Sequence, residues 1–121
     1  MRVYILGPMT GIKDDNRPAF RKAAETLRKM GAEVVSPDEL DLLDPLPEGT
    51  RTWADYLRRD LPWVVQAEAG AALPGWRNSK GATLEATILN ALGRPVFELR
   101  GEQLVQVEPE ALPRPSYSTT L

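Results

Sequence analysis

The stretch Arg2-Val-Tyr-Ile-Leu6, followed directly by Gly7-Pro8, decides the fold class of this chain. It is a short apolar run rich in β-branched and aromatic residues, and it stops at a pair of residues typical of a turn. A helix of ordinary length does not fit in so few residues. We therefore predict a buried β-strand here.

A helical period follows from Asn16. One face of this segment carries the apolar side chains Phe20, Ala23, Ala24, Leu27 and Met30, and the charged side chains lie outside it. Asp15 or Asn16 is expected to cap the helix, and Gly31 to end it. Glu33-Val-Val-Ser36 is then a second strand. Together these segments predict a β-loop-α-β unit of the size that a parallel crossover needs.

The rest of the chain continues the alternation of helices and strands. Residues 37–51, with three prolines and an acidic cluster, are interpreted as a loop with a helical turn at 38–43. Thr52 is expected to cap a helix over 53–66 that Pro62 kinks or splits. The remaining predictions are a strand over 69–73, a helix over 80–92 capped by Asn78 or Ser79, a strand over 95–99 and a weak strand over 103–107.

This order of elements predicts a single α/β domain over residues 1–107. We expect a flavodoxin-like (Rossmann-like) open parallel sheet of four to five strands, flanked by helices. Ligands of such sheets bind at the carboxyl ends of the strands, here the loops after Leu6, Ser36 and Leu73. Residues 108–121, rich in proline, are expected to form a tail that adds nothing to the core.

Composition narrows the chemistry. The 121 residues contain no cysteine and no histidine, which excludes disulfides, thiolate metal sites and catalysis by Cys or His. Acid-base chemistry is left to Asp, Glu, Lys or Tyr. A net charge of −2 disfavours nucleic acid as the main partner. No apolar stretch approaches the length of a membrane span and no targeting signal is visible, so we expect a cytoplasmic protein that acts on small molecules.

Two helices place a carboxylate on the face that should be apolar. In the helix over 80–92, Glu85 shares its face with Ile88, Leu89 and Leu92. Gly81 lies one turn before Glu85 on that face and leaves space beside its carboxylate.

In the helix over 53–66, the apolar face holds Trp53, Tyr56, Leu57, Asp60 and Val64, and Asp60 is its one charged member. A buried carboxylate is costly unless it is paired or hydrogen-bonded, and burial raises its pKa. Two such positions in one small domain call for an explanation.

Two interpretations remain open. Glu85 and Asp60 line one cleft and divide the roles of nucleophile and general acid-base. Alternatively, Asp60 pairs with Arg58, Arg59 or Lys80, and Glu85 accepts a hydrogen bond from a backbone donor, without catalysis. Tyr4, near the carboxyl end of the first strand, is either a core aromatic or a hydroxyl that reaches the same cleft.

Two loops offer candidate ligand contacts. Gly7, Pro8, Met9 and Thr10 follow the first strand and present backbone amides, or form a plain turn. The second loop precedes the Glu85 helix.

In that second loop, Trp76 either stacks on a base or, exposed, covers a subunit interface. Ser79 caps the helix, donates to a ligand, or does both.

Three motifs in register resemble one enzyme superfamily: Tyr4-Ile-Leu-Gly-Pro-Met-Thr-Gly11, Arg59-Asp-Leu-Pro-Trp63 and Ser79-Lys-Gly-Ala-Thr-Leu-Glu85. They are similar to those of the nucleoside 2-deoxyribosyltransferases, a superfamily that includes 2'-deoxynucleoside 5'-phosphate N-hydrolase. More narrowly, the chain resembles a small branch common in phage and bacterial genomes. The resemblance covers about residues 1–100.

The resemblance implies cleavage of the N-glycosidic bond of a nucleoside or nucleotide by a homodimer or larger oligomer, with no cofactor and no metal. By position, Glu85 would be the nucleophile, Asp60 the acid-base or orienting carboxylate, and Tyr4 the hydroxyl that steadies Glu85. This agrees with the pattern of the two helices. The chemistry parallels that of retaining glycosidases.

Two departures from the family pattern limit what is carried over. Pro8 and Thr10 stand where the nucleotide hydrolases carry Ser and Arg for the 5'-phosphate, so a free nucleoside is at least as good a candidate substrate. Glu68 stands where an Asp often follows the second helix. The alternatives are a non-catalytic nucleotide-binding module of the same fold and a module that binds a protein partner.

Overall fold

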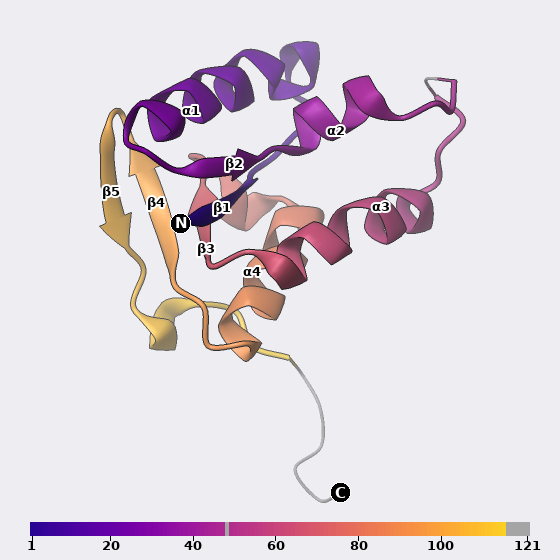
Figure 1. Ribbon diagram of the computed structural model, residues 1–121. Coiled ribbons are helices and arrows are strands. Elements are labelled where there is room, and N and C mark those ends of the chain that lie inside the picture. Colours follow the sequence, from indigo (N-terminus) through magenta and orange to yellow (C-terminus); the bar gives the residue numbers. More distant parts are fainter. Residues whose placement is uncertain (48, 116–121) are drawn as a thin grey trace, which may run out of the picture.

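The computed structural model describes residues 1–47 and 49–115, and these form a five-stranded sheet with helices on both faces (Figure 1). The strands are β1 (Arg2–Leu6), β2 (Glu33–Val35), β3 (Ala69–Ala72), β4 (Val96–Arg100) and β5 (Gln103–Gln106). The α-helices are α1 (Arg17–Lys29), α2 (Pro37–Leu43), α3 (Trp53–Gln66) and α4 (Lys80–Ala91). Short 3-10 turns are η1 (Lys13–Asn16), η2 (Trp76–Asn78) and η3 (Pro109–Ala111).

The strand order is β2-β1-β3-β4-β5, which is the flavodoxin-like order, and the predicted fold class is confirmed. The first four strands of that order pair in parallel. β5 pairs with β4 in antiparallel fashion, because the connection around Gly101 is a tight turn too short for a crossover. The sheet is therefore parallel except at one edge.

Alternation along β1 divides the core into two layers. Val3 and Ile5 face α1, while Tyr4 and Leu6 face α3 and α4 on the other side of the sheet. β3 is built of alanine and glycine, which lets α4 approach closely. A Cβ at Gly70 would lie 2.6 Å from a methyl carbon of Leu89.

α3 is one helix from end to end. Thr52 caps it as predicted, in a capping box in which Thr52 and Asp55 exchange side-chain and backbone hydrogen bonds. Pro62 lies inside the helix without splitting it, although its missing N–H leaves the carbonyl of Arg58 without the usual partner. The segment over 37–51, expected as a loop with one turn, contains the seven-residue helix α2.

The capping expected at α1 is wrong in detail. Asn16 occupies the N-cap position, but its φ of 60° is left-handed and its side chain makes no capping bond. Its amide instead donates a 2.9 Å hydrogen bond to the carbonyl of Pro8. The side chain thus ties the loop after β1 to the start of α1.

The expectation that the chain after residue 107 adds nothing to the core is wrong for its first part. Leu112 is 4% exposed and packs in the layer that contains Leu89. Arg77 holds this segment through a 3.0 Å hydrogen bond to the carbonyl of Ala111. In the sequence, the only indication that this segment is buried is the apolar Leu112 within a proline-rich stretch. The end of the expected tail, residues 116–121, lies outside the described residues.

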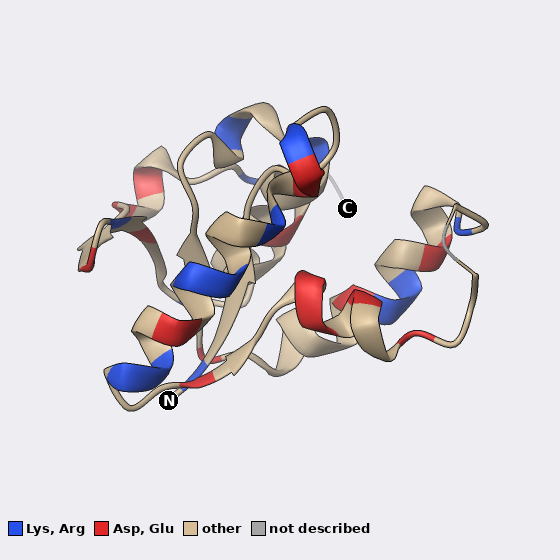
Figure 2. Cartoon of the chain, turned by 90° about the horizontal axis from the view of Figure 1, so that it is seen from above, with Lys and Arg blue, Asp and Glu red and all other residues tan. Residues whose placement is uncertain are grey.

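Acidic and basic residues are interspersed along the chain (Figure 2). None of the described helices has both the length and the apolar composition needed to traverse a bilayer.

Candidate active site

A cleft of about 230 Å³ opens at the carboxyl ends of β1 and β3, the point where the strand order reverses direction. Flavodoxin-like sheets bind their ligands at this position. The lining residues come from the loop after β1, from the ends of the helices and from α3 and α4: Gly7, Met9, Thr10, Asp15, Arg17, Pro37, Asp41, Trp53, Tyr56, Leu57, Arg59, Asp60, Ser79, Gly81, Ala82 and Glu85. A larger hollow of about 460 Å³ lies between α1 and α2, but it contains none of the predicted site residues.

Glu85 lies at the floor of the cleft, on the inner face of α4. The helix begins where the Ser79 hydroxyl accepts a 3.2 Å hydrogen bond from the amide of Ala82. Glu85 is only 8% exposed, and burial raises its pKa to about 8. With a pKa of about 8, Glu85 gains and loses its proton near neutral pH.

Tyr4 reaches Glu85 from the middle of the sheet. It is fully buried, and its hydroxyl donates a 2.5 Å hydrogen bond to Oε2 of Glu85. This bond opposes the effect of burial on the Glu85 pKa. Burial and the neighbouring Glu85 raise the pKa of Tyr4 well above its usual value, so the hydroxyl stays a donor.

Asp60 lies on the inner face of α3, and its side chain is 13% exposed. Burial raises its pKa, while the Arg59 guanidinium, which donates from Nε to Oδ1 at 2.7 Å, opposes this rise. The charge of Asp60 also raises the pKa of Glu85, and the two residues line the same cleft. The structure therefore brings both predicted acids and Tyr4 to one place.

Part of the non-catalytic interpretation is also met, because Asp60 pairs with Arg59 as that interpretation expected. Glu85, in contrast, accepts its hydrogen bond from a tyrosine hydroxyl and from no backbone donor among the described residues. Asp60 can pair with Arg59 while Glu85 faces the cleft, so the geometry agrees with both interpretations. Activity measurements distinguish them.

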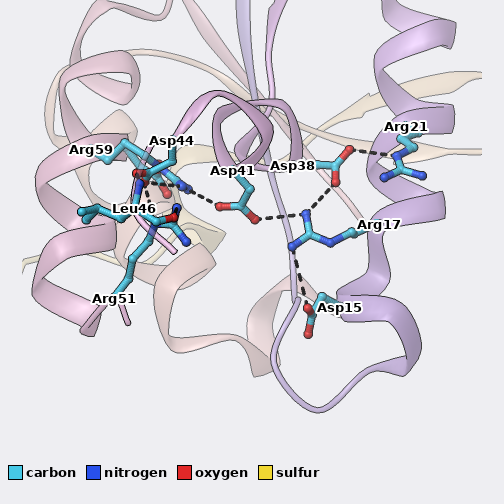
Figure 3. A network of polar contacts seen from close by, with 10 residues as sticks. Asp15, Arg17, Arg21, Asp38, Asp41, Asp44, Leu46, Arg51 and Arg59 are labelled. Atoms are coloured by element: carbon cyan, nitrogen blue, oxygen red, sulfur yellow. Dashed lines mark hydrogen bonds and ion pairs between the residues drawn. The ribbon is translucent and has the colours of Figure 1, made fainter. Parts of the chain in front are cut away.

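Arg59 connects the site to a network of ion pairs that sequence reasoning missed (Figure 3). Its Nη1 lies 2.6 Å from Oδ1 of Asp41 and 3.4 Å from Oδ2 of Asp44. Asp44 also accepts a 2.6 Å hydrogen bond from Arg51. The signal was present in the sequence, because Asp38, Asp41 and Asp44 follow one another at a spacing of three residues.

Aromatic residues of α3 form the outer wall of the cleft. Trp53 is 47% exposed, and the ammonium of Lys80 lies 4.3 Å from its ring centroid. The Arg59 guanidinium lies 5.2 Å from the ring centroid of Tyr56. Both rings were assigned to the buried face of the helix, so their place in the cleft wall was not foreseen.

The predicted loop residues divide into two groups. Gly7, Met9 and Thr10 line the cleft, and Pro8 does not.

Ser79 both caps α4 and lines the cleft. Gly81 also lines it, and a Cβ there would meet nothing within 4 Å, as the space expected beside Glu85 requires.

Trp76 was expected either to stack on a base or, exposed, to cover a subunit interface, and its place in the structure matches neither alternative. Trp76 is 2% exposed, packs in the core with Leu112 and donates from Nε1 to Oε2 of Glu98 at 3.0 Å. It does not line the cleft and belongs instead to the core cluster that includes Val107 and Leu112, from the chain that follows β5.

No group of three or more carboxylates among the described residues is arranged to hold a metal ion. The arginines described above pair with most of the acids near the cleft.

The fold and the cleft together define a flavodoxin-like α/β protein with four carboxyl groups, among them Glu85 and Asp60, in the cleft at its switch point. The chain belongs to the family described as a domain of unknown function, DUF4406, whose model matches residues 1–98. No curated protein matches significantly.

Solved structures show the same fold. A 2-deoxyribosyltransferase from the psychrotolerant bacterium Bacillus psychrosaccharolyticus matches with a TM-score of 0.65 and 22% identity, over 92% of this chain and 80% of that one. A conserved protein from Enterococcus faecalis V583 matches with a TM-score of 0.58 and 18% identity, over 81% of this chain and 62% of that one. The fold that the three sequence motifs implied is thus found in a 2-deoxyribosyltransferase.

Proposed function

We propose that the protein cleaves the N-glycosidic bond of a (deoxy)nucleoside or nucleotide and passes the sugar to a second base or to water. The observation that carries the proposal is the buried pair of Glu85 and Tyr4 at the floor of a cleft that Asp60 also lines. The likeness of the fold to a 2-deoxyribosyltransferase and the three sequence motifs support it.

In the first step, a carboxylate oxygen of Glu85 attacks the anomeric carbon of the sugar. The bond from that carbon to the base nitrogen breaks, and its electron pair leaves with the base. Asp60, whose pKa is raised by burial, supplies a proton to the departing base. The product is a glycosyl ester on Glu85 and a free base.

In the second step, a nitrogen of another base or a water oxygen attacks the anomeric carbon from the opposite face. The ester bond breaks and Glu85 recovers its electron pair, while Asp60 takes the proton of the attacking group. Two inversions retain the configuration, as in retaining glycosidases. The Tyr4 hydroxyl holds the Glu85 carboxylate in place through both steps.

Incubation with a panel of nucleosides and their 5'-monophosphates, with and without a second base, tests the proposal. Chromatography should detect free base, or exchanged base when an acceptor is present. Glu85→Ala should abolish turnover, and Glu25→Gln, a change at an exposed position of α1, should preserve it. Base release by Glu85→Ala equal to that of the native protein would refute the assignment of the nucleophile.

A non-catalytic nucleotide-binding module is the second candidate, and the ion pair of Asp60 with Arg59 favours it. A carboxylate already neutralised by an arginine is a weak proton donor. This candidate expects binding of nucleotides by native protein and by Glu85→Gln with similar affinity, measured by calorimetry, and no base release by either. Turnover by the native protein excludes it.

We also propose that the protein is cytoplasmic and forms a homodimer or larger oligomer, as the resemblance implies. Leu42 and Leu43, at the end of α2, are 71% and 80% exposed and offer apolar surface for association. Light scattering coupled to size-exclusion chromatography measures the molar mass. A mass near 13.4 kDa at every concentration would contradict the oligomer.

A further inference from the structure

The two arginines that line the cleft share one partner, Asp41 (Figure 3). Oδ2 of Asp41 lies 3.1 Å from Nη1 of Arg17, and Oδ1 lies 2.6 Å from Nη1 of Arg59. Asp41 belongs to α2, whereas the arginines begin α1 and lie within α3. The Asp41 carboxylate thus lies between the two guanidinium groups of the cleft and pairs with both.

Each guanidinium has two further carboxylates within ion-pair distance. Arg17 lies 2.8 Å from Asp38 and 3.8 Å from Asp15. Asp38 is 1% exposed, so this pair is firmly held.

Arg59 lies 2.7 Å from Asp60 and 3.4 Å from Asp44. A phosphate entering the cleft would have to displace carboxylates that are already in place around both guanidinium groups. Displaced carboxylates would then face the phosphate at short range, which repels it.

The charge balance of the cleft points the same way. The described lining residues carry four carboxyl groups, on Asp15, Asp41, Asp60 and Glu85, against two guanidinium groups, which gives a formal sum of −2 when all are ionised. The ammonium of Lys80 lies over the ring of Trp53 at the rim and is not among the lining groups.

We infer that Asp41 determines substrate specificity by occupying both arginines, so that the cleft takes nucleosides without a 5'-phosphate. The inference rests on the proposed function. Pro8 and Thr10 agree with it, because neither side chain brings a cation to the loop after β1. Sugar and base are uncharged and make no demand on the guanidinium groups.

The test compares kcat/KM for a deoxynucleoside with kcat/KM for its 5'-monophosphate, for each base that the panel shows to be released. The native protein should prefer the nucleoside by about tenfold or more. Asp41→Asn removes the one carboxylate charge that both arginines share, so it should lower this preference by about tenfold. The ratio is the readout, because any loss of catalysis through Arg59 and Asp60 affects both substrates alike.

Glu39→Gln is the matched control. It removes the same charge from the same helix, but Glu39 pairs with Arg28 on the side of α2 away from the cleft. Its ratio should equal that of the native protein. A shift as large as that of Asp41→Asn would attribute the effect to the general charge of α2 and overturn the role of Asp41.

Salt dependence provides a second measurement that needs no folded Asp41 variant. Binding of the monophosphate to Glu85→Gln is measured by calorimetry between about 0.05 and 0.5 M salt. Repulsion from a negative cleft predicts that its affinity relative to the nucleoside rises with salt. A relative affinity that falls with salt indicates a phosphate bound by cations and overturns the inference.

These outcomes separate the inference from the proposed function. A native protein that releases base preferentially from monophosphates overturns the inference and leaves the proposed function standing. A protein that releases no base but binds nucleosides more tightly than monophosphates overturns the proposed function and retains the specificity that we assign to Asp41.

Discussion

The Tyr4 hydroxyl and the Glu85 carboxylate are 81 residues apart in the chain and 2.5 Å apart in the structure. Tyr4 comes from β1, an inner strand of the sheet, and Glu85 from α4. The hydrogen bond lowers the pKa of Glu85 against the larger effect of burial, which raises it to about 8. It therefore favours the ionised form that a nucleophile requires.

Tyr4→Phe should shift the pH profile upward. For a nucleoside whose base leaves without protonation, kcat/KM of the native protein should rise with pH and level off above the Glu85 pKa of about 8, because only the carboxylate attacks. Without the hydroxyl the pKa of Glu85 rises, so the profile levels off at higher pH and activity at neutral pH falls about tenfold. A lower plateau with an unchanged midpoint would show that Tyr4 does not act through the ionisation of Glu85.

Asp60→Asn should move the same profile in the opposite direction. The charge of Asp60 raises the pKa of Glu85, so its removal lowers the midpoint. For nucleosides whose base must be protonated to leave, kcat/KM should fall by about a hundredfold, since the proton donor for the base is lost. Nucleosides whose base leaves readily without protonation should lose less. Equal losses for all leaving bases would contradict the role of Asp60 as acid.

Glu85→Gln should stabilise the fold in a pH-dependent way. The pKa of Glu85 is about 8 in the folded chain against an ordinary value of 4.5, so the folded state binds more protons between these values. Stability of the native protein then falls as pH rises through that window, by up to about 1.4 kcal/mol per pH unit.

Glutamine does not ionise, so the stability of the Glu85→Gln variant does not fall in this pH window, and its side chain can still accept a hydrogen bond from Tyr4. Its advantage in free energy of unfolding, measured by urea denaturation, should be small near pH 4.5 and largest at pH 8 and above. Denaturation curves that differ by a constant amount at every pH would refute the raised pKa.

Gly81→Ala should separate stability from activity. The position is helical, its Cβ would meet nothing within 4 Å, and the residue lines the cleft. Alanine should stabilise α4 by about 1 kcal/mol, because glycine costs more backbone entropy. The added methyl group narrows the space beside Glu85 and should raise KM. A higher melting temperature with unchanged KM would place the substrate elsewhere.

Trp76→Phe should affect the fold and not the choice of base. The variant loses the hydrogen bond from the indole to Glu98 and part of the packing against Leu112. Unfolding free energy should fall by about 1 to 3 kcal/mol. Relative kcat/KM values for the different bases should stay the same. A selective loss for one class of base would restore Trp76 as a binding residue.

The pattern of apolar residues was sufficient for the fold class and for two of the acids. Glu85 and Asp60 interrupt otherwise apolar helix faces, and the structure puts both residues at one cleft. The apolar face of a helix shows which of its side chains point inward, and the carboxyl ends of parallel strands meet at one edge of the sheet. Local periodicity was therefore enough to predict that Glu85 and Asp60 lie at the same cleft. The role of Tyr4 remained ambiguous, because helices cover both faces of the sheet and a strand side chain is therefore buried whichever face it points to.

Several features depended on contacts that local patterns do not encode. Trp76 and Leu112 belong to one layer of the core although they are distant in the chain, and both were expected outside the core. The burial of both residues depends on which surfaces remain uncovered after the sheet has formed. The antiparallel course of β5, in contrast, follows from a local feature, the short turn at Gly101.

By itself the sequence determined the alternation of strands and helices, the parallel core of the sheet and the presence of two acids on inward faces, because these follow from residue periodicity over a few turns. Only the tertiary structure decided that Asp41 lies between Arg17 and Arg59 and that Tyr4 donates to Glu85. Such pairings join elements distant in sequence, and their distances and the desolvation of the charged groups are set by packing of the whole domain.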